Sequence, residues 1–229
     1  MNTIIRIEDL WKCYDGEDCG ETSALRGLHL LVGAGETVAI YGKSGSGKST
    51  LFNLIAGLDR PTRGTISLEG RDIHNMGESE RTQFRRARLG FVFQFFNLIP
   101  TLTALENVTL PLEMLGREPR RAHETLKSVG LSGKENRFPH ELSGGEQQRV
   151  AIARAVVKDP VLILADEPTG NLDTETGDQI LALLQELSRN TGATLLLATH
   201  STRSSRIADR VLIMSDGRIT EGQQAESRL

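Results

Sequence analysis

Cysteine is scarce in this 229-residue sequence, which contains only Cys13 and Cys19. Two cysteines do not complete a cysteine-based zinc site, and they do not supply the several crosslinks that hold small secreted domains together. We therefore expect two reduced thiols, as in a cytoplasmic protein. The sequence also lacks a run of 18 apolar residues, the length of a membrane span, and its start lacks a signal-peptide pattern. Any role in a membrane process would be carried out from outside the bilayer.

An excess of charge is also missing, because 27 lysines and arginines stand against 30 aspartates and glutamates, a formal net charge of −3. Balanced charge gives no global attraction to nucleic acid or to an anionic membrane surface. One helical segment is basic, with arginines at 81, 85, 86 and 88. Such a segment is more typical of a solvated face than of a binding patch, and we assign it no function. Function must therefore be sought in local motifs.

The clearest motif is a glycine-rich stretch that follows an apolar run at residues 38–41 and precedes another at 51–56. The order predicts strand, tight loop and helix, so that inward N–H groups and a helix N-terminus form a cradle for phosphate. Lys48 would reach the β- and γ-phosphates, and the Ser49 hydroxyl would reach a magnesium ion. A plain surface turn is the alternative, but it leaves the flanking strand and helix unexplained. The stretch reads Gly42-Lys43-Ser44-Gly45-Ser46-Gly47-Lys48-Ser49-Thr50.

An acidic pair, Asp166 and Glu167, follows the short apolar run at residues 161–165, which is typical of a central parallel strand. The pair would lie at the carboxyl end of that strand, where α/β sheets bind their ligands. Asp166 can hold magnesium through water, and Glu167 can orient or deprotonate a water that attacks the γ-phosphate. An exposed acidic turn is the alternative, and it fits poorly with so apolar a strand.

Three further side chains stand beside predicted strands. Gln94 follows a core strand and can sense metal and attacking water through its amide. His200 follows the buried strand at 194–199 and can bond the γ-phosphate or fix the water, although a lone histidine is usually structural. Tyr14 follows the first of two predicted antiparallel strands, 3–10 and 25–32, and either stacks on an adenine ring or packs on the sheet.

A second glycine pair occurs in Ser143-Gly144-Gly145, ahead of a helix predicted over residues 150–157. Glycines just before a helix offer inward N–H groups at the positive end of its dipole. The stretch is therefore a second candidate phosphate site. One chain with one phosphate loop does not obviously need it.

The chain resembles the ATP-binding cassette ATPases over almost its whole length, and residues 142–149, LSGGEQQR, match the signature of that family. The resemblance makes residues 42–50 the Walker A loop that binds ATP. It assigns the remaining roles as follows: Tyr14 stacks on adenine, Gln94 is the Q-loop, Asp166 is the Walker B aspartate, Glu167 is the catalytic glutamate, Asn171-Leu172-Asp173 is the D-loop and His200 is the switch histidine. Lys43 and Ser201 depart from the commonest pattern, which has proline and an acid at these positions.

The resemblance implies an α/β phosphate-loop NTPase core of RecA-like type, with an antiparallel β subdomain and an inserted α-helical subdomain. One ATPase domain would span 1–229, its core at 1–93 and 157–229 and its helical subdomain at 94–156. In the family, the signature of one subunit completes the ATP site of its partner. Ser143, Gly144 and Gly145 would therefore bind the partner's ATP in a head-to-tail homodimer. Asp173 of the D-loop would also bind ATP. Mg2+ would be held by Ser49, Gln94 and Asp166.

Within the family, residues 91–100, 102–108 and 165–173 are similar to the lipoprotein-releasing and macrolide-exporting branch. That branch works with integral membrane permeases at the cytoplasmic face of the inner membrane and with no nucleic acid. The resemblance implies export, lipoprotein release or mechanotransmission; the alternative is a regulatory subunit of the cell-division type that signals without transport. The phenylalanines after Gln94 would either receive the coupling helix of the permease or pack within the subdomain.

Overall fold

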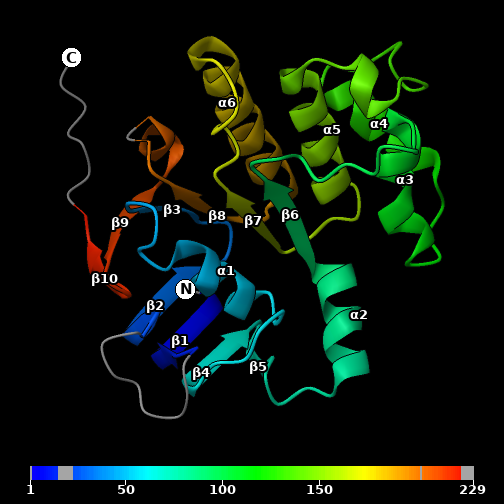
Figure 1. Cartoon of the computed structure of the whole chain (residues 1–229). Helices are drawn as coiled ribbons and strands as arrows, with labels where there is room; N and C mark the ends of the chain where they lie inside the picture. Colours follow the sequence, from blue (N-terminus) through cyan, green and yellow to red (C-terminus); the bar gives the residue numbers. More distant parts are fainter. Residues whose placement is uncertain (1, 15–22, 202, 223–229) are drawn as a thin grey trace. The chain divides into compact units, whose positions relative to one another are not determined.

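A computed structural model describes residues 2–14, 23–201 and 203–222 (Figure 1). The chain forms two compact units, one made of Met1–Arg85 with Leu196–Leu229 and the other of Arg86–Leu195. Each unit is described by itself. Among the described residues, no helix has both the length and the apolar character needed to cross a membrane.

The first unit contains an antiparallel sheet with the strand order β2-β1-β4-β5. Alternate residues of β1, among them Ile5 and Ile7, are fully buried because successive side chains of a strand point to opposite faces. The first two strands pair with each other as predicted. The strands are β1 (Thr3–Lys12), β2 (Leu25–Gly33), β4 (Arg63–Leu68) and β5 (Arg71–Asp72).

A second sheet of the same unit carries the phosphate loop. Its strand order is β10-β9-β3-β8, and β3 runs parallel to β9. Asp216 and Gly217, with φ of 50° and 73°, form the turn between β9 and β10, as expected of a tight hairpin. The elements are β3 (Thr37–Tyr41), α1 (Lys48–Ile55), β8 (Thr194–Thr199), the 3-10 helix η2 (Ser204–Ile207), β9 (Arg210–Ser215) and β10 (Arg218–Glu221). Two elements cross the boundary between the units: α2 (Glu78–Arg88) ends in the second unit, and β8 begins in it.

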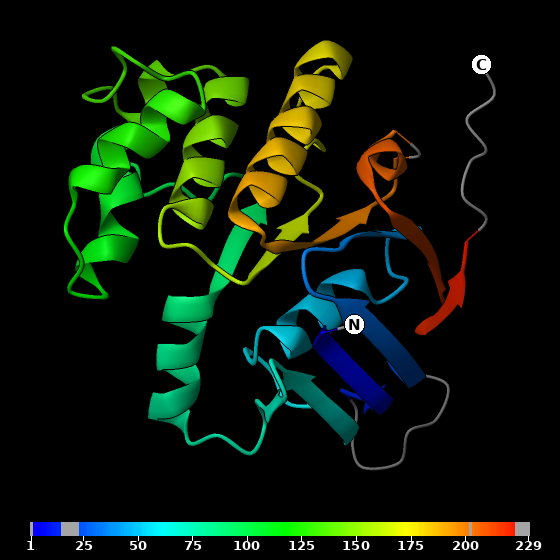
Figure 2. The ribbon, with the colours of Figure 1, turned by 180° about the vertical axis from the view of Figure 1, so that it is seen from behind.

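The second unit combines two parallel strands with helices, and α3, α4 and α5 lie together in the green segment of Figure 2. β7 pairs in parallel with β6 and is buried along its apolar part, which agrees with the predicted central strand. The elements are β6 (Leu89–Phe93), α3 (Ala104–Glu113), α4 (Arg120–Ser128), the 3-10 helix η1 (Pro139–Glu141), α5 (Gly144–Val156), β7 (Leu162–Asp166) and α6 (Thr174–Thr191). The predicted fold class, α/β with an antiparallel β part and a helical part, is confirmed.

Two expectations about single residues are wrong. Cys13 is disulfide-bonded rather than reduced, and Cys19, the only other cysteine in the sequence, lies outside the described residues. Arg81 is only 2% exposed and pairs with Glu78 at 3.0 Å, so this part of the basic segment is not a solvated face. A Cβ at Gly57 would lie 2.8 Å from Cδ of Arg81, so that glycine leaves room for the buried arginine.

Candidate functional site

The glycine-rich loop connects β3 to α1 and wraps around the side chain of Lys48. The Lys48 ammonium donates hydrogen bonds to the carbonyl oxygens of Gly42 at 2.7 Å and Lys43 at 3.0 Å, and the residue is 5% exposed. Gly47 caps α1 with φ of 107°, so the loop enters the helix in a left-handed conformation that only glycine adopts without strain. The loop thus places a buried cation and a helix N-terminus together, which suits a phosphate group.

The close approach of the backbone explains why two positions in the loop require glycine. A Cβ at Gly42 would lie 2.5 Å from the carbonyl oxygen of Met214. A Cβ at Gly47 would lie 2.6 Å from the carbonyl oxygen of Ala24. Both contacts are with backbone atoms, which cannot rotate away, so a side chain at either position would displace the loop.

Tyr14 is 59% exposed, and its hydroxyl donates to Asp59 at 3.3 Å. Lys12 donates to the other oxygen of the Asp59 carboxylate at 2.7 Å and lies 4.8 Å from the centre of the tyrosine ring. Although partial burial opposes ionisation, hydrogen bonds from Lys12 and the Arg60 amide hold the pKa of Asp59 below its usual value. The ring is held at its hydroxyl end and is not packed into the sheet; adenine stacking stays a prediction. The contacts of Asp59 with Lys12 and Tyr14 were not foreseen from the sequence.

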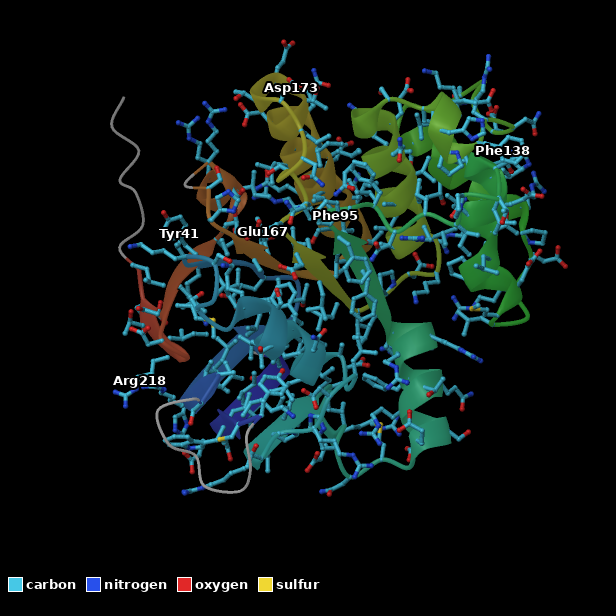
Figure 3. The ribbon with its side chains drawn as sticks, viewed as in Figure 1. Tyr41, Phe95, Phe138, Glu167, Asp173 and Arg218 are labelled. Atoms are coloured by element: carbon cyan, nitrogen blue, oxygen red, sulfur yellow. The ribbon has the colours of Figure 1, made fainter. Side chains whose placement is uncertain are left out.

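In the second unit, the structure brings the predicted metal-sensing and acidic side chains to the ends of two adjacent strands. Phe93 and Asp166 are register partners in the parallel pair β6 and β7, so Gln94 and Glu167 both follow at the same edge. Glu167, labelled in Figure 3, has φ of 48°, a left-handed conformation that is strained for a glutamate. The register therefore places Gln94 and Glu167 at the same edge of this strand pair, and the roles assigned to them stay predictions.

An amide pair fixes Gln94 to the loop that follows Glu167. Gln94 Nε2 donates to Asn171 Oδ1 at 3.3 Å, and Asn171 Nδ2 donates to the Gln94 carbonyl at 3.0 Å. A Cβ at Gly170 would lie 2.6 Å from Gln94 Nε2, so the loop passes directly beside the amide. The family resemblance implied that Asn171 belongs to the D-loop, but it did not predict this pairing with Gln94.

Asp173 begins α6 as its N-cap and is labelled in Figure 3. Its carboxylate accepts hydrogen bonds from the backbone N–H groups of Glu175 and Thr176, and the Thr176 contacts hold its pKa below the usual value. This capping gives Asp173 a structural task in the single chain. The predicted contact with ATP stays a prediction.

The signature helix begins earlier than predicted. α5 starts at Gly144 rather than at Val150, because Ser143 and Glu146 form a capping box: the Glu146 N–H donates to Ser143 Oγ at 3.3 Å, and the Ser143 N–H donates to Glu146 Oε2 at 2.9 Å. The two glycines therefore belong to the first helical turn and do not form a turn before it. A Cβ at Gly145 would lie 2.6 Å from the Thr176 methyl group, so glycine allows α5 to approach α6 closely.

His200 follows directly after β8, as predicted, and is exposed. The loop behind it is tied by polar contacts: the Ser201 N–H donates to Thr199 Oγ1 at 2.9 Å, and the hydroxyls of Thr199 and Ser204 lie 3.1 Å apart. Ser201, where the family pattern has an acid, thus contributes through its backbone. The role of His200 as the switch histidine stays a prediction.

The predicted magnesium ligands are a hydroxyl, an amide and a carboxylate. Oxygen donors of this kind suit Mg2+, which commonly takes few protein ligands and completes its shell with water and phosphate. In the described part of the chain, no group of three or more histidine, cysteine, aspartate or glutamate residues could hold a metal alone. The side chains of Ser49, Gln94 and Asp166 each offer an oxygen donor that suits Mg2+, and a site formed by the three together stays a prediction.

A cavity of about 250 Å³ in the second unit was not foreseen from the sequence. Phe91 and Phe93, whose rings stack 5.8 Å apart, line it together with the cations Arg154 and Lys158. The Arg154 guanidinium donates to the Phe96 carbonyl at 2.8 Å and also to the Asn97 carbonyl, which holds a turn in which both residues have positive φ. Burial lowers the pKa of Arg154.

Because of Lys158, we expect the free energy of unfolding to rise as the pH increases from about 8 to 10.5. Burial and the nearby charge of Arg117 lower the pKa of the Lys158 ammonium from 10.5 to about 8. Below about pH 8 the Lys158 ammonium is charged in both the folded and the unfolded states, so the folded state bears the full free-energy cost of burying that charge. As the pH rises from 8 to 10.5, the group loses its proton in the folded state first, and this cost disappears. Lys158→Met should therefore raise the free energy of unfolding at pH 7 by up to about 3 kcal/mol, and the gain should vanish near pH 10.5.

Urea unfolding of the wild type and of Lys158→Met at pH 7 and at pH 10 measures this difference. The exposed Lys127, on α4, provides the control Lys127→Met, which should change stability by no more than about 0.5 kcal/mol at either pH. A gain from Lys158→Met that is equal at both pH values would contradict the assigned titration.

Comparison with known proteins gives a consistent result. The sequence model of the family described as ABC transporter matches residues 25–170. An uncharacterized ABC transporter ATP-binding protein of Mycobacterium tuberculosis is 52% identical, covering 98% of this chain and 92% of its own. The lipoprotein-releasing system ATP-binding protein LolD of Geobacter metallireducens is 44% identical, covering 96% and 99%.

Solved structures agree with these relatives. The dimeric, post-hydrolysis structure of the ATP-binding cassette MJ0796 with ADP and Pi has a TM-score of 0.86, with 40% identity over 98% of this chain and 100% of that chain. The structure of cbiO1 from Clostridium perfringens, part of the ABC transporter complex cbiONQ, has a TM-score of 0.85, with 30% identity over 96% and 88%.

Proposed function

Because the chain belongs to the ABC transporter ATP-binding family and is a cassette ATPase, we propose that it forms an ATP-dependent head-to-tail homodimer that drives a membrane permease. The permease would carry out export, lipoprotein release or mechanotransmission, with the ATPase bound peripherally at the cytoplasmic face of the inner membrane. The similarity to LolD along nearly the whole chain supports this branch. We take 94–156 as the helical subdomain and 1–93 with 157–229 as the core.

The observation that carries the proposal is the position of Ser143 at the capped N-terminus of α5. A helix N-terminus with a serine hydroxyl favours an anion, and the phosphate loop is already the anion site for the chain's own nucleotide. A phosphate of ATP bound by a second copy of the chain would satisfy this second site. MJ0796, which is 41% identical, forms a dimeric cassette.

The residues of the site divide the work of hydrolysis. Lys48 and the loop N–H groups bind the phosphates, and Tyr14 orients the base. Glu167 accepts a proton from the attacking water, and His200 donates a hydrogen bond to the γ-phosphate. Ser49, Gln94 and Asp166 would hold Mg2+, which neutralises phosphate charge when bound. Hydrolysis removes the shared γ-phosphate, so the dimer opens.

We expect Phe95 to be required for stimulation of ATPase activity by the permease and not for ATP hydrolysis by the isolated chain. Its side chain is 71% exposed and follows Gln94, so packing within the subdomain does not account for it. Phe95→Ser should leave ATPase activity of the isolated chain within about twofold and lower permease-stimulated activity by about tenfold or more, since aromatic anchors dominate interfaces. Phe138→Ser, at another exposed aromatic of the same unit, is the control.

The test is a pull-down from membranes that identifies the permease, followed by ATPase assays of the reconstituted pair with candidate substrates. Stimulation by a transported or released substrate supports the proposal. A partner that binds the ATPase but moves nothing in reconstituted vesicles favours the regulatory alternative. Absence of any membrane partner for the wild type would contradict both.

A further inference from the structure

Gln148, in the second turn of α5, is completely buried and joins two separate loops. Its Nε2 donates one hydrogen bond to the Pro168 carbonyl at 2.7 Å and one to the Phe93 carbonyl at 3.3 Å. Phe93 immediately precedes Gln94, and Pro168 immediately follows Glu167. A single amide group thus bridges the backbone beside the metal-sensing glutamine and the backbone beside the catalytic glutamate.

The orientation of this amide is determined by its surroundings. Rotating it by half a turn would place the oxygen against two carbonyl oxygens, which are acceptors only. In the observed orientation Oε1 is buried and has no hydrogen-bond partner in the described part of the chain. A buried acceptor without a partner lowers the stability of the folded chain, and methionine of similar length would avoid that cost. Packing alone therefore does not explain a glutamine at this position, and the two donated bonds do.

The bridge also connects to the amide pair described above. Gln94 is bonded to Asn171, so its side chain is fixed to the loop after Glu167, while Gln148 fixes the backbone on both sides of this assembly. Along α5, Gln148 lies five residues after Ser143, a rise of about 7.5 Å. Because a helix is stiff over so short a distance, a shift of the signature end moves both bridged carbonyls.

We propose that Gln148 is a positioning residue that couples the two ATP sites of the dimer. The inference rests on the proposed function, in which a chain's signature binds the partner's ATP while its Gln94 and Glu167 act on its own. Engagement of Ser143 by one nucleotide is transmitted through Gln148 to the residues that hydrolyse the other. Each site therefore becomes fully competent only when its counterpart is occupied.

The decisive variant is Gln148→Met, which keeps the length and burial of the side chain and removes both donors. ATP binding should change by less than about threefold, because Gln148 contacts no predicted ATP ligand. The maximal rate of hydrolysis should fall by about 10- to 100-fold, the effect of a small misplacement of reacting groups. The Hill coefficient for ATP should fall from near 2, the number of coupled sites, to near 1. A merely structural role for Gln148 would not lower the Hill coefficient.

Asn107→Leu is a matched control. Asn107 is also completely buried, and its Nδ2 bridges carbonyl oxygens, those of Ile99, Leu102 and Thr103, away from Gln94 and Glu167. This variant should lose stability but keep the wild-type Hill coefficient. If Gln148→Met does not fold, Gln148→Asn keeps the amide but is one methylene too short to span both loops, and it should show the same loss of cooperativity.

The outcomes separate this inference from the proposed function. A wild type that neither dimerises with ATP nor shows cooperativity would overturn the proposed function itself. A cooperative wild type together with a folded Gln148→Met of unchanged rate and unchanged Hill coefficient would overturn only the coupling role of Gln148. Loss of cooperativity in Gln148→Met and not in Asn107→Leu supports it.

Discussion

Replacement of Glu167 by glutamine is expected to lower steady-state ATP hydrolysis by about 100-fold or more, while ATP still binds. A positioned general base contributes about 10²- to 10⁴-fold, and glutamine has the size of glutamate but cannot accept the proton. Since ATP is no longer consumed, the variant should accumulate as a stable dimer. Initial-rate assays measure the first effect, and gel filtration with and without ATP measures the second.

The control for this variant is Glu186→Gln on α6, which removes a carboxylate from an exposed position away from the strand ends. It should retain the wild-type rate and dissociate as the wild type does. Substantial steady-state turnover by Glu167→Gln would exclude Glu167 as the catalytic base and would shift attention to other groups that follow the strands.

Ser143→Arg, introduced into the Glu167→Gln background, should abolish the ATP-dependent dimer. The serine hydroxyl and the first helical turn would bind the partner's phosphate, and a long side chain at the N-cap would occupy that space. We expect the dimer to weaken by at least about 100-fold, because the loss of a buried charge-assisted contact and the steric clash act together. Analytical ultracentrifugation with ATP measures the dissociation constant.

The chain contains its own control for the cap itself. Thr103 begins α3 in the same kind of capping box, with Glu106 as the reciprocal partner. Thr103→Arg should lose about 1 kcal/mol of stability, as Ser143→Arg should, but it should leave the dimer intact. A dimer that persists in Ser143→Arg would argue against a signature that acts on the partner's ATP. Equal loss of the dimer in both variants would indicate general helix damage.

The sequence allowed the strand-loop-helix unit and the strand ends to be predicted because their signals are local. Glycines around Lys48 and an apolar run before Asp166 are visible within ten residues. The start of α5 was placed wrongly because glycine weighs against a helix in sequence reasoning, whereas the capping box of Ser143 and Glu146 stabilises the first turn. The LSGGE pattern contains both capping residues, so the correct start could have been found.

Other features could not be predicted because they depend on residues distant in the chain. Arg81 is buried because Gly57 leaves space beside it. Gln148 joins Phe93 to Pro168, across 55 and 20 residues of sequence. The pKa of Lys158 is lowered because the side chain is buried, and a lysine in the sequence gives no indication of such burial. Such contacts are set by tertiary packing, and no periodicity reports them.

Glu167 has a left-handed backbone conformation, with φ of 48°, which lowers the stability of the folded chain. Glycine would relax this conformation, and asparagine would tolerate it better, so either residue suits the folded chain alone more than glutamate does. The proposed function assigns the proton transfer to this glutamate, so it implies that thermodynamic stability is lost here in exchange for turnover. In a search for more heat-resistant forms of this enzyme, substitutions at this position would be enriched by a stability screen and eliminated by an activity screen.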